Sequence, residues 1–277
     1  MTMPLEIIDV HQHVNWGGKD DTGLISYLDS LGVGKCWLLS WETVDGGLDY
    51  GYQHISIKEV FETFEKYPDR IIPFAGVDCR RDNPEQLLRE YKARGACGYG
   101  EIKWHINYDN WDAIRMFRLA GELGMPVIVH IQYPATKMPH WWYGGHISAF
   151  ERAITLCPDT IFLGHAQSWW AHISGDAHPD TLDVAYPPGP VTEGGDVPRM
   201  LATYPNLYAD LSAGSGYNAL TRDRDFGRKF LIDFADKVCY GVDGYDDRMF
   251  TFIKECDLPD DVYAKIMGGN ARKILGE

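Results

Sequence analysis

The sequence predicts a closed (β/α)8 barrel, the TIM-barrel architecture, as one domain over residues 1–277. The chain of 277 residues shows no break in composition, which favours a single large domain. Eight short β-prone runs alternate with segments of helical periodicity. These runs are apolar, as expected of parallel strands covered on both faces. A doubly wound open sheet would show the same alternation, and one miscounted edge strand would exchange the two folds.

The individual elements follow from local signals. The first strand, 7–13, begins apolar and ends in a His-x-His pair. Leucines at helical spacing and a final glycine define the helix at 22–32. Proline ends the helix at 55–68 and opens the helix at 84–95. The remaining predicted strands are 35–41, 71–78, 97–104, 126–131, 160–166, 206–213 and 237–244, and the remaining helices are 111–124, 148–158, 197–205 and 219–236, followed by two short helices.

The connection at 168–197, after the sixth strand, departs from the short loops elsewhere. It is rich in Pro, Gly, Asp and aromatic residues and has no clear periodicity. Long irregular connections in compact domains commonly serve as active-site lids or binding loops. We therefore expect this lid-like insertion to cover the C-terminal mouth of the barrel. The alternative is a solvent-exposed insertion without a role.

Composition excludes several classes of partner. A net charge of −14 argues against binding to nucleic acid or to an anionic membrane, because both need basic patches. The six cysteines lack CxxC spacing and favour reduced, buried thiols. The N-terminal residues do not resemble a signal peptide, and no apolar run approaches the ~20 residues of a membrane span. We expect a cytoplasmic protein whose partner is a small-molecule substrate, with homo-oligomer formation left open.

Metal-competent side chains end five of the predicted strands, which is where barrel active sites are built. His11 and His13 share one face of the first strand, together with Asp9, because strand side chains alternate. The other strand-end candidates are Glu101 (fourth strand), His130 (fifth), His165 (sixth) and Asp243 (eighth). Any one of them could be a satisfied core residue. Together they predict a bound cation, because a dry interior would not tolerate so many ionisable groups without one.

The motifs around these residues resemble the amidohydrolase superfamily, in particular its amidohydrolase-related (amidohydrolase 2) branch, which also contains aromatic-acid decarboxylases. The resemblance covers essentially the whole chain and is carried by the first-strand HxH, GEIK at 100–103, VIVH at 127–130, FLGH at 162–165, YGVD at 240–243 and GGNARKILG at 268–276. It implies one or two divalent ions at the barrel mouth. It also implies that Asp243 handles the proton of a metal-activated water.

The resemblance leaves two ligand sets open. In the first, His11, His13 and Asp243 bind one ion, Glu101 bridges, and His130 and His165 hold a second ion. In the second, His11, His13, His130 and Asp243 bind a single ion, and His165 is free for acid–base catalysis or for contact with substrate. Mixed His and carboxylate ligands favour Zn2+, and Mn2+ or Fe2+ also suits them.

The expected activity is metal-dependent hydrolysis of a C–O or C–N bond in a lactone, ester or amide, with Asp243 and His165 as catalytic residues. The alternative is a non-oxidative decarboxylase or hydratase of an aromatic or dicarboxylic acid, and a third class is a metal-free binding protein. Tryptophans at strand ends suggest an aromatic-walled pocket. The expected substrate-binding residues are Lys103, Arg80, Trp16, Trp104 and Trp169, with Trp41, Trp141, Trp142 and Trp170 in similar positions.

Overall fold

The computed structural model describes residues 5–46, 52–134, 140–177 and 186–277. Within these residues, eight parallel strands pair in sequence order from β1 to β8. Backbone hydrogen bonds from Val10 N to Tyr240 O (3.0 Å) and from Asp243 N to His11 O (2.9 Å) join the last strand to the first. The sheet is therefore a nearly closed barrel, as predicted. The strands are β1 (Ile7–Gln12), β2 (Val33–Leu39), β3 (Ile71–Ala75), β4 (Gly98–Ile102), β5 (Val127–His130), β6 (Phe162–His165), β7 (Leu207–Asp210) and β8 (Val238–Cys239).

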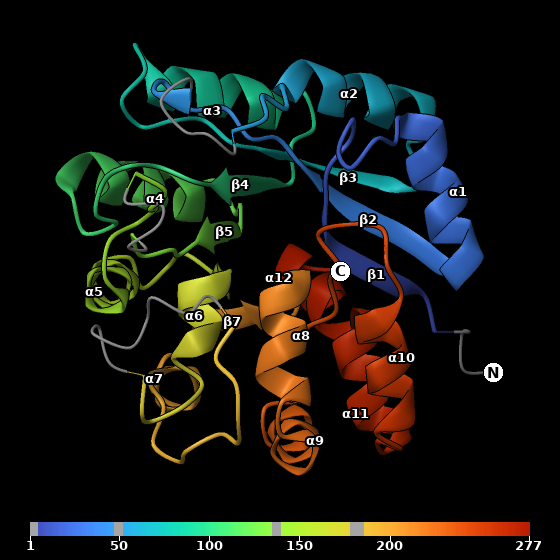
Figure 1. Cartoon of the computed structure of the whole chain (residues 1–277). Helices are drawn as coiled ribbons and strands as arrows, with labels where there is room; N and C mark the ends of the chain where they lie inside the picture. Colours follow the sequence, from blue (N-terminus) through green and yellow to red (C-terminus); the bar gives the residue numbers. More distant parts are fainter. Residues whose placement is uncertain (1–4, 47–51, 135–139, 178–185) are drawn as a thin grey trace.

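Helices surround the strands and supply the outer layer (Figure 1). They are α1 (Asp21–Leu31), α2 (Ile57–Lys66), α3 (Pro84–Ala93), α4 (Trp111–Glu122), α5 (Ile147–Leu156), α6 (Gln167–Ala171), α7 (Asp196–Thr203), α8 (Ala213–Thr221), α9 (Arg224–Asp233), α10 (Arg248–Glu255), α11 (Asp260–Ala264), the π-helical turn η3 (Lys265–Gly269) and α12 (Asn270–Leu275). The helix predicted over 219–236 is in fact two helices. The break occurs because the Asp223 side chain accepts from Phe226 N and starts α9 anew.

The second helix begins two residues later than predicted. Ser56 caps α2, and its side chain and that of Glu59 form a reciprocal capping box. Ile55 instead pairs with Trp41 through two backbone hydrogen bonds. Start signals in the sequence thus set the helix boundary more accurately than the apolar periodicity does.

The barrel interior below the site is filled by side chains from every strand except β4, with Ala271 and Ile274 of α12 completing the cluster. At this level β4 has Gly98, which leaves room for the Phe74 ring. A Cβ on this residue would lie 1.9 Å from that ring. Ile8 and Val10 of β1 belong to this interior cluster. Regular alternation would then turn the side chains of His11 and His13 away from this interior. A register shift between Asp9 and Gln12 interrupts the alternation.

The segment 168–197 is not wholly irregular. Its first residues lie in α6, and α7 begins at its C-terminal end. Residues 178–185, the centre of the expected lid, lie outside the described residues. Among the described helices, none is long and apolar enough to cross a membrane.

Candidate metal centre and active site

Four side-chain donor atoms converge at the C-terminal end of the barrel. His11 Nε2 lies 3.3 Å from His13 Nε2, and Glu101 Oε2 lies 3.5 Å from the first and 3.2 Å from the second of these nitrogens. Asp243 Oδ1 lies 3.7 Å from both nitrogens. Ligands about 2.0–2.1 Å from a tetrahedral ion are roughly 3.3 Å apart. The four atoms therefore have the spacing of ligands around one cation.

Hydrogen bonds behind the two rings decide which nitrogens face this centre. His11 Nδ1 lies 2.6 Å from Asp210 Oδ2, and His13 Nδ1 lies 2.8 Å from Leu39 O. A carboxylate and a carbonyl only accept, so both Nδ1 atoms carry a proton, and in the neutral rings both Nε2 atoms present lone pairs. Two buried lone pairs 3.3 Å apart repel each other unless a cation lies between them. The ring tautomers therefore fit a metal ion.

The charge balance of the cluster also fits a divalent ion. Lys103 Nζ lies 2.8 Å from Glu101 Oε2. With neutral histidines, the carboxylates of Glu101, Asp210 and Asp243 and the one ammonium of the described cluster leave two uncompensated negative charges. Burial opposes ionisation of Asp243, but positive charge on the facing histidines, that of His11 foremost, lowers its pKa to about 2. The carboxylate is thus ready to bind a cation. Burial likewise opposes protonation of His11, but the three carboxylates raise the pKa of His11 well above its ordinary value, so a proton takes up part of this negative charge when no metal ion is bound.

The second oxygen of Glu101 faces the other two histidines. His130 Nδ1 lies 2.7 Å from Oε1, and His165 Nε2 lies 3.6 Å from the same atom. These three residues are close enough together to hold an ion. However, His130 Nε2 already lies 3.0 Å from Gln132 Oε1, and rotation of that amide by 180° places its NH2 group there as a donor to Nε2. Burial and the positive Lys103 lower the pKa of His130 to about 4, so the neutral ring donates Nδ1–H to Glu101 and orients that carboxylate.

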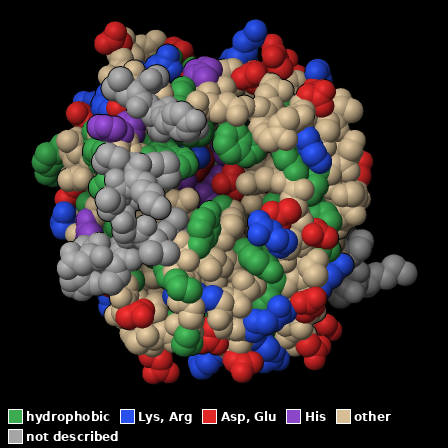
Figure 2. Space-filling model, viewed as in Figure 1, with side chains coloured by type: hydrophobic (Ala, Val, Ile, Leu, Met, Phe, Trp, Pro, Cys, Tyr) green, Lys and Arg blue, Asp and Glu red, His purple; other side chains and the backbone are tan. Residues whose placement is uncertain are grey.

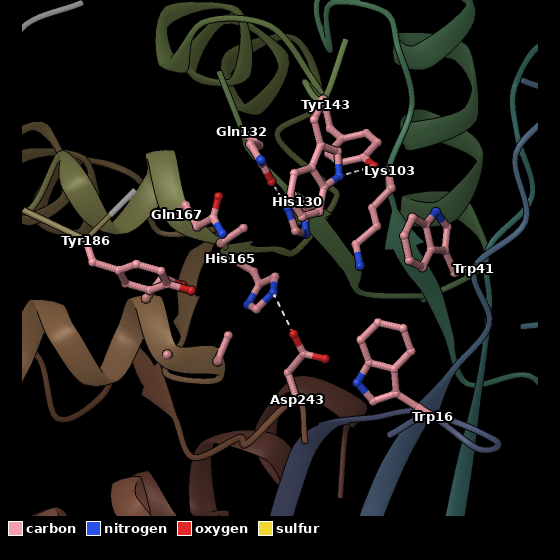
Figure 3. A pocket seen from close by; sticks show the side chains of 15 residues that line it. Trp16, Trp41, Lys103, His130, Gln132, Tyr143, His165, Gln167, Tyr186 and Asp243 are labelled. Carbon is pink, nitrogen blue, oxygen red and sulfur yellow. Dashed lines mark hydrogen bonds and ion pairs between the residues drawn. The ribbon is translucent and has the colours of Figure 1, made fainter. Parts of the chain in front are cut away.

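His165 is the last residue of β6, and Figure 3 shows its ring directed towards Asp243. Its Nδ1 lies 3.0 Å from Ser212 Oγ and 3.3 Å from Asp210 Oδ2. Its Nε2 is buried without a hydrogen-bond partner among the described residues, 3.6 Å from Asp243 Oδ2. An imidazole nitrogen in this position can exchange a proton with a molecule bound above it.

A cavity of about 340 Å³ opens above the donor atoms, where Figure 2 shows histidine and acidic side chains at the bottom of a hollow. Its walls are largely aromatic, and Figure 3 shows Lys103 pointing into it. Lys103 Nζ also lies 3.8 Å from the centre of the Trp41 ring, a cation–π contact. The lining residues are Trp16, Trp41, Lys103, His130, Gln132, Trp141, Tyr143, His165, Ala166, Gln167, Tyr186, Ala213, Gly214, Ser215 and Asp243.

Three of these lining residues adopt backbone conformations that non-glycine residues rarely occupy. Asp243, Ala166 and Ala213 have φ angles of 51°, 84° and 64°. Such conformations cost free energy and tend to occur at functional sites, where the surroundings hold them in place. Ala166 directly follows β6, Ala213 begins α8 three residues after the end of β7, and Asp243 lies four residues beyond β8. All three set the direction in which the chain leaves the barrel at the cavity.

The structure places two of the five expected substrate-binding residues, Trp16 and Lys103, in the cavity wall. The other three lie outside this cavity wall. Trp104 is buried and stacks on Phe117, and Trp169 is buried against Gly164. Arg80 is held by Asp45 and Asp78, each of which accepts two hydrogen bonds from its guanidinium group. Among the described residues that line the cavity, none of these three is present.

Sequence reasoning missed Asp210, which ends β7 and contacts both His11 and His165. The signal was available, because an acidic residue follows the apolar run of the seventh predicted strand just as others follow the remaining strands. Asp9 was expected beside the imidazoles, but its carboxylate accepts instead from the backbone of His11 and Val242 and from the Gln12 amide. No comparable sequence signal marks Gln132.

Solved structures with the same fold include enzymes of two reaction types. The 5-carboxyvanillate decarboxylase of Sphingomonas paucimobilis has a TM-score of 0.63 at 16% identity, covering 99% of this chain and 99% of that chain. A probable 2-pyrone-4,6-dicarboxylic acid hydrolase of Acinetobacter baumannii, with citric acid bound, has a TM-score of 0.63 at 15% identity, covering 98% and 100%. A Polaromonas dihydroxybenzoic acid decarboxylase with bound manganese and an inhibitor has a TM-score of 0.61 at 13% identity, covering 99% and 97%.

At these identities the structural likeness establishes the fold alone. No functionally curated protein matches the sequence. The family model for amidohydrolases, in contrast, matches residues 8–276, nearly the whole chain, and includes every strand that carries a donor atom. The chain therefore belongs to the amidohydrolase family of metal-dependent enzymes.

Proposed function

We propose that this protein is a metal-dependent hydrolase that cleaves a C–O or C–N bond of a small lactone, ester or amide. The observation that supports this most directly is the pairing of Asp243 Oδ2 with the bare Nε2 of His165 at 3.6 Å, both at the cavity. Hydrolysis requires one proton to leave the attacking water and one to reach the leaving group. Two adjacent proton-accepting groups can perform both transfers.

His11, His13 and Glu101 would hold the ion, with Asp243 completing the set. When bound, a divalent ion supplies a water molecule with a pKa lowered to about 7 and polarises the carbonyl under attack. Zn2+ suits this mixture of imidazole and carboxylate donors, and Mn2+ or Fe2+ also suits it. The manganese bound in the Polaromonas relative is compatible with this set of metals.

The residues of the chain divide the remaining work. The Asp243 carboxylate accepts the proton of the attacking water and hands it to His165 Nε2, 3.6 Å away, which then donates it to the departing oxygen or nitrogen. Lys103 has its ammonium group at the cavity and is 6% exposed, so it can hold a negatively charged group of the substrate. The tryptophan walls favour a flat substrate. Tyr186, within the segment 168–197, lines the same cavity.

Non-oxidative decarboxylation of an aromatic acid is the second candidate. The aromatic walls beside Lys103 favour it, because they suit a flat carboxylic acid. Two relatives in the comparison are decarboxylases. This reaction consumes a single proton at carbon, which His165 or Asp243 alone could provide.

Product analysis separates the two candidates. Protein loaded with Zn2+ or Mn2+ would be incubated with matched lactones, esters, amides and aromatic acids. Hydrolysis releases acid, an alcohol or an amine without loss of carbon, whereas decarboxylation releases carbon dioxide. Metal-dependent turnover of a lactone, ester or amide supports the proposal. Carbon dioxide from the acids alone would replace it with the second candidate, and absence of bound metal and of turnover would favour a binding protein.

Asp243→Asn tests the assigned proton acceptor. We expect turnover to fall by about 10³-fold, within the range for loss of general base catalysis, while most of the metal is retained. The matched control is Asp246→Asn, which changes an acidic residue of the same turn that pairs with Arg248 outside the cavity. Retained turnover in Asp243→Asn would remove this residue from its role.

A further inference from the structure

Asp210 is a buried carboxylate that joins two histidines of the site. Its Oδ2 lies 2.6 Å from His11 Nδ1 and 3.3 Å from His165 Nδ1. Its Oδ1 accepts the backbone N–H of Ser212 at 2.9 Å. The side chain is fully buried, and the described residues that line the cavity do not include it. Asp210 therefore acts on the site only through other residues.

We propose that Asp210 is a positioning residue that sets the tautomers of His11 and His165 together. The Asp210 oxygen only accepts: its 2.6 Å hydrogen bond keeps a proton on His11 Nδ1, and its negative charge 3.3 Å from His165 Nδ1 favours a proton there as well. Each neutral ring then presents the lone pair of Nε2 to the centre. His11 belongs to the donor set, and His165 faces the Asp243 carboxylate. The residue thus links metal affinity to proton transfer. This inference rests on the proposed metal centre.

The other described groups that contact Nδ1 of His13 or His165 each contact a single ring, whereas Asp210 contacts two. Leu39 O contacts His13 Nδ1, and Ser212 Oγ contacts His165 Nδ1. Loss of the Ser212 hydroxyl should therefore disturb His165 alone. Loss of the Asp210 carboxylate should disturb a metal ligand and the proton-transfer residue at once.

Asp210→Asn tests the inference because it reverses the hydrogen bond without changing the shape of the side chain. Ser212 N–H still requires an acceptor, so the amide oxygen occupies the Oδ1 position and the NH2 group faces the two rings. An NH2 group only donates, so His11 Nδ1 must lose its proton and His11 Nε2 must gain one, and the same group favours this change at His165. The proton then occupies the position from which His11 would bind metal.

The first measurement is nitrogen NMR of 15N-labelled, metal-stripped protein, with ring signals assigned from His11→Gln and His165→Gln. At a pH high enough to leave both rings neutral, we expect Nδ1–H rings at both positions in the wild type and Nε2–H rings in Asp210→Asn. The second measurement is the Zn2+ dissociation constant by chelator competition. We expect it to rise about 10- to 100-fold, the usual cost of removing such a support.

Asp9→Asn is the matched control. Asp9 is equally buried and lies two residues from His11, but its carboxylate accepts from backbone N–H groups and the Gln12 amide. Among the described contacts of Asp9, no hydrogen bond reaches an imidazole ring. We expect its ring tautomers and its zinc affinity to match those of the wild type.

A neutral ring that carries its only proton on Nε2, at either histidine of the wild type, overturns the inference, even if Asp210→Asn fails to fold. Unchanged tautomers in a folded Asp210→Asn protein also overturn it. Gly241→Ala provides a second variant, because a Cβ there would lie 2.6 Å from Asp210 Oδ1 and displace the carboxylate. We expect it to weaken zinc binding in the same direction, and unchanged zinc binding would count against the inference. If the wild type binds no zinc, the proposed function fails, whereas the tautomer measurement still decides the role of Asp210.

Discussion

The two pairs of histidines on either side of Glu101 use the same residue type in different ways. In the β1 pair, His11 and His13 are held from behind through Nδ1, and their Nε2 atoms converge to 3.3 Å. In the β5–β6 pair, His130 has partners at both ring nitrogens, and only His165 presents an unpaired Nε2. Both pairs contact the same carboxylate.

This difference shows that the number of histidines does not determine the number of ions. A ring binds metal when its second nitrogen is fixed by an acceptor, which leaves a lone pair at the centre. The β1 pair satisfies this condition at both rings, whereas in the β5–β6 pair only His165 satisfies it. A second ion would therefore lack its second imidazole, and we propose one ion, bound on the β1 side of Glu101, with His130 supporting the carboxylate.

His13→Gln should have the largest effect, because it removes one of the two converging lone pairs. We expect loss of most bound metal and a fall in turnover of at least about 10³-fold, since an ion of this kind contributes several kcal/mol. Elemental analysis and turnover measure the two effects. His54→Gln, at a histidine whose side chain is 59% exposed, is the control. Full metal content in His13→Gln would show that the β1 pair is not the ligand pair.

His130→Gln tests whether His130, in the other pair of histidines, is a metal ligand. We expect the metal content to stay at one ion per chain, because His130 only orients Glu101. Turnover should fall by about 10- to 100-fold as that carboxylate loses a support. A wild-type content of two ions that drops to one in the variant would instead favour the two-ion arrangement.

Lys103→Met tests whether the ammonium group of Lys103 binds the substrate or supports Glu101. Lys103 contacts Glu101 Oε2, and it also lines the cavity. Loss of one charge-assisted hydrogen bond of about 1.5 kcal/mol should raise KM about tenfold for an anionic substrate. A neutral substrate of the same size is the control and should show little change. An equal effect on both substrates would assign Lys103 to support of Glu101.

The sequence was sufficient to locate the donor residues, because parallel strands end at the same rim of a barrel. His11, His13, Glu101 and Asp243 could be listed from the ends of their strands alone. The fold prediction rested on the same periodicity and is confirmed. The sequence could not show which ring nitrogen faces the centre, because that depends on Leu39 O and Asp210, which are distant in the chain.

The position of Trp104 outside the cavity wall has a simpler explanation. Lys103 and Trp104 are consecutive, so when Lys103 faces the cavity the next side chain faces the helices, where Trp104 meets Phe117 of α4. Strand alternation could therefore have excluded Trp104. Arg80 offered no such signal, because its partner Asp45 lies on another loop.

Gln132→Leu should have the smallest effect and gives the finest test of the comparison. Gln132 holds the second nitrogen of His130, so its loss releases that ring from one partner and keeps the Glu101 contact. A neutral hydrogen bond of about 0.5–1.5 kcal/mol corresponds to a decrease in turnover of roughly two- to tenfold. Metal content should not change. If a second ion appeared in this variant, the orientation of His130 by Gln132 would be the feature that limits the site to one ion.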